Sequence, residues 1–292
     1  MLLRIFLSTL ISLSFFVETA NAKVIKTIDT SVIRQEVLKL TKDDLVTFDV
    51  KGVIFCPKDQ ILAREFIPKY KQFLKQIELT KGIDEAKRLE RIVLLNYEPK
   101  LVDEDIPQII KAIQRKGIKV IALTGGHTGA ISSVESREDL RVKTLKNFGI
   151  DFSSSFLVHM VSFDSLIKKG SNDSVPLYKN GVLFASRYPK GVVLKSFLEK
   201  VKFKPKRIVH IDNSVKKIDD VERFADEAGI DYLGIHYTKI HENYPQELDQ
   251  AVADKKLEIL VEKDLWISDK VAKCMINTKS SIEKCNTKNL VR

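Results

Sequence analysis

Short runs of apolar residues alternate along the chain with longer segments in which apolar residues recur every three or four positions. The short runs predict buried strands, and the longer segments predict amphipathic helices. This alternation is typical of an α/β fold with a mainly parallel sheet. The predicted strands are 45–49, 119–123, 156–161, 182–185, 207–211 and 232–235, and the predicted helices are 104–116, 136–147, 190–200 and 215–228.

Two segments depart from this alternation. Asn180 and Gly181 stand between two apolar runs, which predicts a tight turn and one antiparallel hairpin. Residues 57–100 follow the first predicted strand and carry a helical pattern rich in Lys, Glu, Leu and Ile. A connection of that length with helices of its own predicts a small inserted subdomain over the strand ends. Ligands of open α/β sheets bind at those ends.

The first 22 residues have the pattern of a secretory signal peptide. Arg4 precedes an apolar stretch over 5–17, and the segment 20–22 reads Ala-Asn-Ala, the small-x-small pattern of a cleavage site. The apolar stretch is shorter than the ~20 residues of a membrane-spanning helix, although a retained anchor is the alternative. We therefore expect an exported protein, periplasmic or secreted, with no later membrane span. The predicted division is a signal peptide at 1–22, a core at 23–56 and 101–262, a helical cap at 57–100 and a tail at 263–292.

Composition and charge exclude some classes of protein but do not identify a function. The 292 residues are 44% hydrophobic and 30% charged, which excludes a collagenous or wholly disordered chain. The formal net charge of +10 favours anionic partners. The basic residues are scattered among acids, without an Arg-rich arm, so we expect no specific nucleic-acid binding. The predicted partners are a small phosphorylated substrate or a partner protein.

Cysteine and histidine spacing adds few candidates. Cys274 and Cys285 lie close enough in the C-terminal segment to close a small loop in an oxidising compartment. Cys56 is left over and is expected to be a buried small hydrophobe. His210 falls inside a predicted strand and is expected to be a core residue. His127 follows two glycines at a strand end and is a candidate for contact with a substrate phosphate.

Polar residues gather at the predicted carboxyl edge of the sheet. Asp49, Thr124 and Asp212 each stand at the end of a strand, and Lys190 opens a helix. Because the carboxyl ends of parallel strands share one edge, these four side chains are expected to lie close together. Two carboxylates suit a hard cation such as Mg²⁺, and a hydroxyl with an ammonium suits phosphoryl oxygens.

These residues resemble the motifs of the haloacid dehalogenase (HAD) superfamily, and more narrowly an uncharacterised exported HAD-like family of bacteria. The resemblance runs from about Asp43 to Leu260, through 101–110, 120–124, 147–153, 190–194 and 234–237. It implies a three-layer α/β sandwich with a small helical cap after the first strand. It also implies Mg²⁺-dependent phosphomonoester hydrolysis through an aspartyl-phosphate on Asp49. The residues that it assigns are Asp49, Lys51, Thr124 and Lys190 for catalysis; Thr124, Gly125 and Lys190 for phosphate; and Asp49, Lys51, Asp212 and Asn213 for metal.

Several positions depart from those motifs. Lys51 stands where the superfamily has an acid that serves as general acid and base, Asn213 replaces a second acid, and Gly125 with Gly126 replaces an Arg. A general acid or base contributes about 10²–10⁴-fold to a rate. If Lys51 points inward, it pairs with Asp49 and takes the metal position; if it points away, its carbonyl can still bind metal. A Lys about 5 Å from a divalent cation costs roughly 6 kcal/mol at an effective dielectric constant near 20.

Two functions therefore stay open. The first is a phosphohydrolase whose turnover is weak or lost because of Lys51. The second is a catalytically inactive binding or effector protein on the same scaffold. A metal-free dehalogenase is a distant third, which the apparent metal ligand Asp212 opposes. Substrate and oligomeric state do not follow from the sequence.

Overall fold

The computed structural model describes residues 23–131, 135–167 and 174–287. The predicted signal peptide, 1–22, lies outside the described residues. A mostly parallel sheet runs through the centre in the order β1-β10-β9-β2-β5-β8-β7-β6, and among these strands β7 alone runs in the opposite direction, antiparallel to β8 and to β6. Its strands are β1 Lys23–Thr27, β2 Leu45–Phe48, β5 Lys119–Thr124, β6 Met160–Ser162, β7 Leu177–Lys179, β8 Val182–Phe184, β9 Arg207–Asp212 and β10 Asp231–Tyr237.

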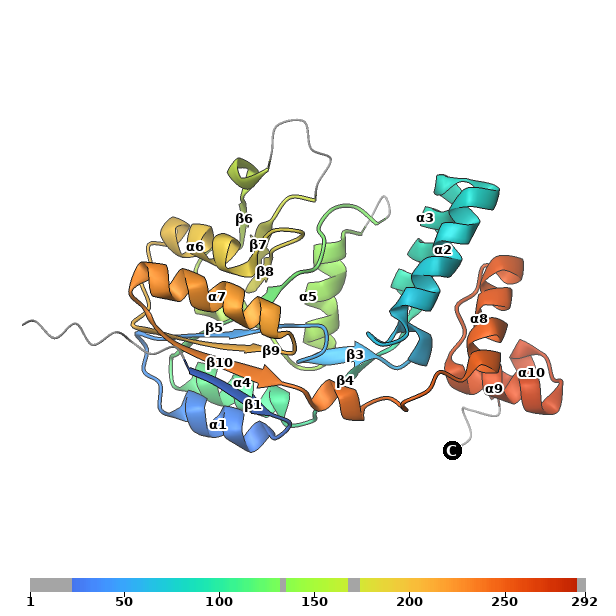
Figure 1. The fold of residues 1–292 in the computed structure, drawn as a ribbon, viewed down its shortest axis with the longest axis horizontal. Helices are drawn as coiled ribbons and strands as arrows, with labels where there is room; N and C mark the ends of the chain where they lie inside the picture. The colour runs from blue at the N-terminus through green and yellow to red at the C-terminus, as the bar shows by residue number, and fades with distance from the viewer. Residues whose placement is uncertain (1–22, 132–134, 168–173, 288–292) are drawn as a thin grey trace, which may run out of the picture.

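Helices pack on both faces of this sheet (Figure 1). In β2, Val46 and Phe48 belong to the apolar cluster on one face, and Leu45 belongs to the cluster on the other. This is the twofold alternation of a strand that is buried on both sides. The expected α/β fold with a mainly parallel sheet is confirmed. One face is covered by α1 Thr30–Leu38, α4 Ile106–Arg115 and α5 Arg137–Asn147, and the other by α6 Lys190–Lys200 and α7 Val215–Ala228.

Most predicted elements are present, with one clear exception. The predicted strand 156–161 is wrong, because only Met160–Ser162 forms a strand there. Phe156 is held instead by edge-to-face contacts with the rings of Phe197 and Phe203, and Leu157 is fully exposed. The hairpin predicted at Asn180 and Gly181 is confirmed as the turn between β7 and β8. The short strand β1 and helix α1 were not predicted.

The segment 57–100 forms a helical hairpin that stands beside the sheet (Figure 1). Its base is a two-stranded antiparallel ribbon, and its apolar face packs against α8 rather than against the sheet. Trp266 belongs to the same apolar cluster. The division into core, cap and tail stays a prediction. The ribbon and hairpin consist of β3 Phe55–Pro57, α2 Ile67–Lys81, α3 Ile83–Asn96 and β4 Pro99–Leu101. The C-terminal helices are α8 Gln250–Lys263, α9 Asp269–Thr278 and α10 Ile282–Thr287. Short 3-10 turns lie at Gln60–Leu62, Ser153–Ser155, Asp164–Leu166 and Lys239–Glu242.

The C-terminal helices are tied to the rest of the chain by a buried charged cluster. Lys256 of α8 is fully buried and forms ion pairs with Asp59 and with Asp269, the latter at 2.6 Å. The indole of Trp266 donates a hydrogen bond to Asp59 at 2.9 Å and lies under the Lys256 ammonium. These contacts join the start of the helical hairpin to α8 and α9.

A disulfide bond joins Cys274 of α9 to Cys285 of α10, as their spacing allowed. Cys56 is buried and carries a free thiol, as expected. Within the described ranges, no helix is both long and apolar enough to cross a membrane.

Replacing Lys256 with Met should lower the free energy of unfolding by about 3–5 kcal/mol, because it leaves Asp59 buried without its cation. Lys255→Met is the matched control. Lys255 is the neighbour on α8 and pairs with Glu258 at the surface, so its loss should cost less than about 1 kcal/mol. Urea denaturation of the two variants measures the difference. Equal costs for the two changes would contradict a structural role of the buried cluster.

Candidate functional site

The sheet order brings together three residues that are far apart in the sequence. Strand β2 lies between β9 and β5, so its carboxyl end is flanked by theirs. Asp49 follows β2, Asp212 ends β9 and Thr124 ends β5. The backbone N–H of Asp49 donates to the Ile211 carbonyl at 2.8 Å, which fixes the aspartate beside the end of β9. The expected meeting of these residues at one sheet edge is therefore observed.

Lys190 connects the two carboxylates. It is the first residue of α6, and its Nζ lies 2.6 Å from Asp49 Oδ1 and 2.6 Å from Asp212 Oδ2. All three side chains are at most 3% exposed. Burial alone would lower the pKa of Lys190, but the carboxylates of Asp212 and Asp49 outweigh it and raise that pKa. The cluster thus holds one cation between two anions and carries one net negative charge.

A hydrogen-bond network fixes the orientation of Asp212. Its Oδ1 accepts from the backbone N–H of Ser214 at 2.9 Å, and its Oδ2 lies 3.4 Å from His210 Nε2. The other ring nitrogen of His210 pairs with the Thr47 hydroxyl at 2.7 Å. Burial lowers the pKa of His210, so the imidazole is neutral. Burial would raise the pKa of Asp212, but the Lys190 cation and the His210 hydrogen bond hold it well below its usual range.

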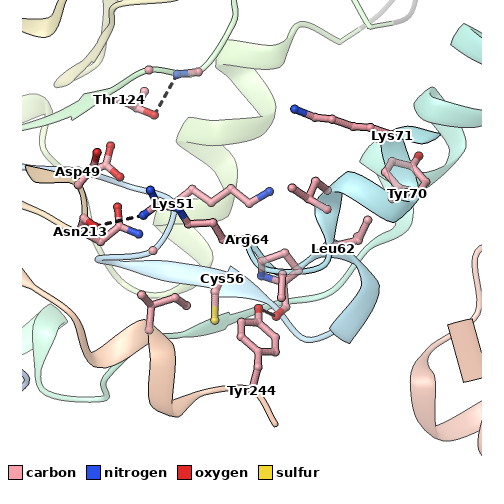
Figure 2. A pocket seen from close by; sticks show the side chains of 18 of the residues that line it. Asp49, Lys51, Cys56, Leu62, Arg64, Tyr70, Lys71, Thr124, Asn213 and Tyr244 are labelled. Atoms are coloured by element: carbon pink, nitrogen blue, oxygen red, sulfur yellow. Dashed lines mark hydrogen bonds between the residues drawn. The ribbon is translucent and has the colours of Figure 1, made fainter. Parts of the chain in front are cut away.

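The turn after Asp49 carries Lys51 away from the carboxylate. Gly52 has φ of +100°, and a Cβ there would lie 2.2 Å from the Asn213 amide nitrogen, so both the turn and the close approach require glycine. Figure 2 shows the Lys51 side chain extended across a cavity, with its ammonium pointing away from Asp49 toward the hairpin of α2 and α3. Lys51 therefore leaves the space beside Asp49 to another group.

That cavity has a volume of about 520 Å³ and lies between the sheet edge and the helical hairpin. Its apolar wall includes Leu62, Ile67 and Leu74, and it also includes Tyr70, whose buried hydroxyl has no hydrogen-bond partner among the described residues. A volume of this size suits a small molecule. The cavity's charged lining residues are the cations Lys51, Arg64, Lys71, Arg141 and Lys217 and the carboxylates of Asp49 and Glu90.

The cations of this cavity lack acidic partners. Within the part of the chain that the structure describes, none of the five forms an ion pair with a carboxylate. Arg64 donates to the Asn213 carbonyl at 3.2 Å, and Arg141 lies over the Phe55 ring. Asp49 shares the Lys190 cation with Asp212. The cavity is therefore a positive site with a single acidic group at its inner end.

The loop after β5 forms the inner rim of the cavity. The Thr124 hydroxyl accepts a hydrogen bond from the backbone N–H of Gly126 at 3.2 Å, so its own proton is available to a ligand. A Cβ at Gly125 would lie 3.5 Å from Lys217 Nζ, which places that ammonium at the rim. Thr124 and Gly125 both line the cavity, and their contact with phosphate stays a prediction. His127 does not line it, but borders a smaller neighbouring cavity of about 180 Å³.

Most of the cations that line the cavity were not predicted as site residues from the sequence. Arg64 and Lys71 come from the hairpin segment, Arg141 from α5 and Lys217 from α7. None stands at a strand end or in a recognisable motif, and each resembles an ordinary solvated residue. His210 is a buried strand residue, as expected, but it also positions Asp212, which its sequence pattern did not indicate.

The donor set is compatible with Mg²⁺ that arrives with a ligand. In the described segments, no three Asp, Glu, His or Cys side chains gather into a metal cluster. Mg²⁺ is often held by one or two carboxylates together with substrate phosphates, so such a cluster is not required. Asp49, the Lys51 carbonyl, Asp212 and Asn213 stay the candidate ligands. Lys190 already shares both carboxylates, which weakens binding of the ion alone.

The fold and the site define a mixed α/β protein with a positively charged cavity at the carboxyl edge of its sheet. The chain belongs to the family described as Protein of unknown function (DUF2608), whose model matches residues 24–273. An uncharacterised protein of Rickettsia felis is 24% identical over 254 residues, covering 82% of this chain and 85% of that protein. One of Rickettsia prowazekii is 21% identical over 252 residues, covering 86% and 89%.

A shorter match is to a Chlamydia pneumoniae protein named as a candidate outer membrane protein. It is 38% identical over 69 residues, which cover 24% of this chain and 26% of that protein. No solved structure matches the chain.

The assignment to the haloacid dehalogenase superfamily was wrong. The matching family is the one of unknown function, and neither the relatives nor any solved structure connects the chain with that superfamily. The resemblance rested on Asp49, Thr124, Lys190 and Asp212, and carboxylates and hydroxyls at strand ends are a general feature of ligand sites in parallel sheets. The site must therefore be interpreted from its own geometry.

Replacing Lys190 with Met should destabilise the protein by about 3–5 kcal/mol at neutral pH, because two buried carboxylates lose their shared cation. In the variant, burial raises the pKa of Asp212 above its unfolded value, so the folded form gains stability as pH falls from 8 to 5. In the wild type that pKa is lowered, and its contribution to stability is lost as pH falls below about 4.

Chemical denaturation of both proteins, from pH 8 to below about pH 4, measures both trends. Lys195→Met, an exposed change on the same helix, should behave as the wild type within about 0.5 kcal/mol. A Lys190→Met variant as stable as the control at pH 8 would show that the ammonium does not hold the two carboxylates.

Proposed function

We propose that the protein binds a phosphorylated small molecule in the cavity at the sheet edge and hydrolyses its phosphomonoester slowly through Asp49. One observation carries the proposal: a single carboxylate, fixed by Lys190, lies at the inner end of a cavity lined by five cations. None of these cations pairs with a carboxylate among the described residues. A phosphate monoester carries about two negative charges near neutral pH, and it supplies the anion that this lining lacks.

The residues suit the two halves of such a reaction. Thr124 and Lys217 hold phosphoryl oxygens, while Lys190 fixes Asp49 Oδ1. Asp49 Oδ2 attacks phosphorus, the bond to the leaving oxygen breaks, and that oxygen takes a proton from water. Water then attacks the aspartyl-phosphate, releasing inorganic phosphate and regenerating the carboxylate. Cationic groups around the phosphoryl oxygens stabilise the charge of both transition states.

Lys51 explains why turnover should be slow. Its ammonium points away from Asp49, so the proton needed by the leaving group comes from water rather than from a positioned acid. The lack of a general acid and base costs about 10²–10⁴-fold in rate. A bound Mg²⁺ would supply further charge neutralisation at the phosphoryl group.

Export is part of the same proposal. The first 22 residues have the signal pattern, and the short match to a Chlamydia pneumoniae protein named as a candidate outer membrane protein is compatible with it. The disulfide between Cys274 and Cys285 also suits an oxidising compartment. We propose that the mature chain acts in the periplasm or outside the cell.

Mature protein with Mg²⁺ should release phosphate from p-nitrophenyl phosphate slowly, and Asp49→Asn should abolish the release, because an amide cannot form the phosphoenzyme. The matched control is Asp219→Asn, an exposed aspartate on α7, which should keep the wild-type rate. Colorimetric release of p-nitrophenol with and without EDTA measures the rate and its dependence on Mg²⁺. An Asp49→Asn rate equal to that of Asp219→Asn would contradict the assignment of the nucleophile.

A binding protein without turnover is the second candidate, and the position of Lys51 favours it. Among the described residues that line the cavity, the only carboxylate besides Asp49 is Glu90 of the hairpin. Asp212, which lies beside Asp49, is itself paired with Lys190, so it is not placed to activate water. In that case wild type and Asp49→Asn are equally inert, yet both bind inorganic phosphate in a calorimetric titration.

A further inference from the structure

The five cations of the cavity fall into two groups. Arg64 and Lys217 lie near the inner end: Arg64 donates to the Asn213 carbonyl, and the Lys217 cation acts on the adjacent Asp212 carboxyl. Lys51, Lys71 and Arg141 form an outer group on three separate elements. Figure 2 shows the ammonium groups of Lys51 and Lys71 reaching into the same space from opposite sides.

Members of the outer group repel one another. Lys51, Lys71 and Arg141 all line the cavity, and in the described part of the chain none of the three pairs with a carboxylate. The Lys51 ammonium points away from Asp49 (Figure 2), so the outer group lies away from that carboxylate, and like charges gathered there gain most from a bound anion.

A single phosphoryl group cannot contact both the inner and the outer group of cations. Bound beside Asp49 and Thr124, it occupies the inner group, and the outer group is left with Glu90 as the only other carboxylate among the described residues that line the cavity. The apolar side chains of Leu62, Ile67 and Leu74 also line the cavity and offer a surface for the carbon skeleton of a ligand.

We propose that Lys51, Lys71 and Arg141 form a second anion subsite, so that the preferred ligand is a small bisphosphorylated molecule with one phosphoryl group at each end. This inference rests on the proposed function, because the first phosphoryl group is the one assigned to Asp49 and Thr124. The subsite binds the second phosphoryl group without taking part in the bond that breaks.

The test compares two sugars that differ by one phosphoryl group, fructose 6-phosphate and fructose 1,6-bisphosphate, by calorimetry on the full mature protein at physiological salt without Mg²⁺. The bisphosphate should bind at least tenfold more tightly. Lys71→Gln should reduce the affinity for the bisphosphate by about tenfold, as expected for loss of a charged hydrogen bond, and that for the monophosphate by no more than about threefold.

Lys75→Gln is the matched control, one turn further along α2 and outside the cavity lining, and should change both affinities less than twofold. Equal affinities for the two sugars, or equal effects of Lys71→Gln and Lys75→Gln, would overturn the second subsite while leaving phosphate binding at Asp49 intact. A preference for the bisphosphate without any phosphate release would keep the subsite and refute hydrolysis. No binding of either sugar would refute both.

Discussion

The site depends on one ammonium group held between two carboxylates. Lys190 reaches from the first turn of α6 to Asp49 and Asp212, which end neighbouring strands, and all three are buried. Two carboxylates this close would repel each other without a shared cation. The ion pairs therefore allow the strand ends to meet and leave one oxygen of Asp49 for the cavity. Such buried pairs are costly to break, so the same contact that prepares the site also holds the sheet edge together.

Sequence patterns predicted the part of the site that belongs to the sheet. Asp49, Thr124 and Asp212 could be found because each follows an apolar run, and Lys190 because it opens a helix with a clear apolar stripe. The direction of Lys51 could not be found, because it is set by the left-handed turn at Gly52 against Asn213. The segment 156–161 was misassigned because its apolar residues pack as isolated aromatic contacts rather than as a strand.

The cations that line the cavity are brought together by the tertiary structure. Arg64, Lys71 and Lys217 are single charges in a chain with 49 Lys and Arg residues, and nothing local distinguishes them from solvated neighbours. They face one space only because the helical hairpin stands over the sheet edge, where the buried Lys256 cluster joins it to α8 and α9. Family membership is similarly not readable from strand-end residues alone, because unrelated α/β proteins place the same chemistry at this edge.

The most direct test of the account is a crystal structure of the mature protein with tungstate, a phosphate analogue whose metal is located by anomalous scattering. The account predicts a tungstate at the inner end of the cavity, within hydrogen-bond reach of the Thr124 hydroxyl and beside Asp49, with Lys190 still bridging Asp49 and Asp212. Tungstate bound only at surface lysines, with the inner cavity filled by water, would contradict it.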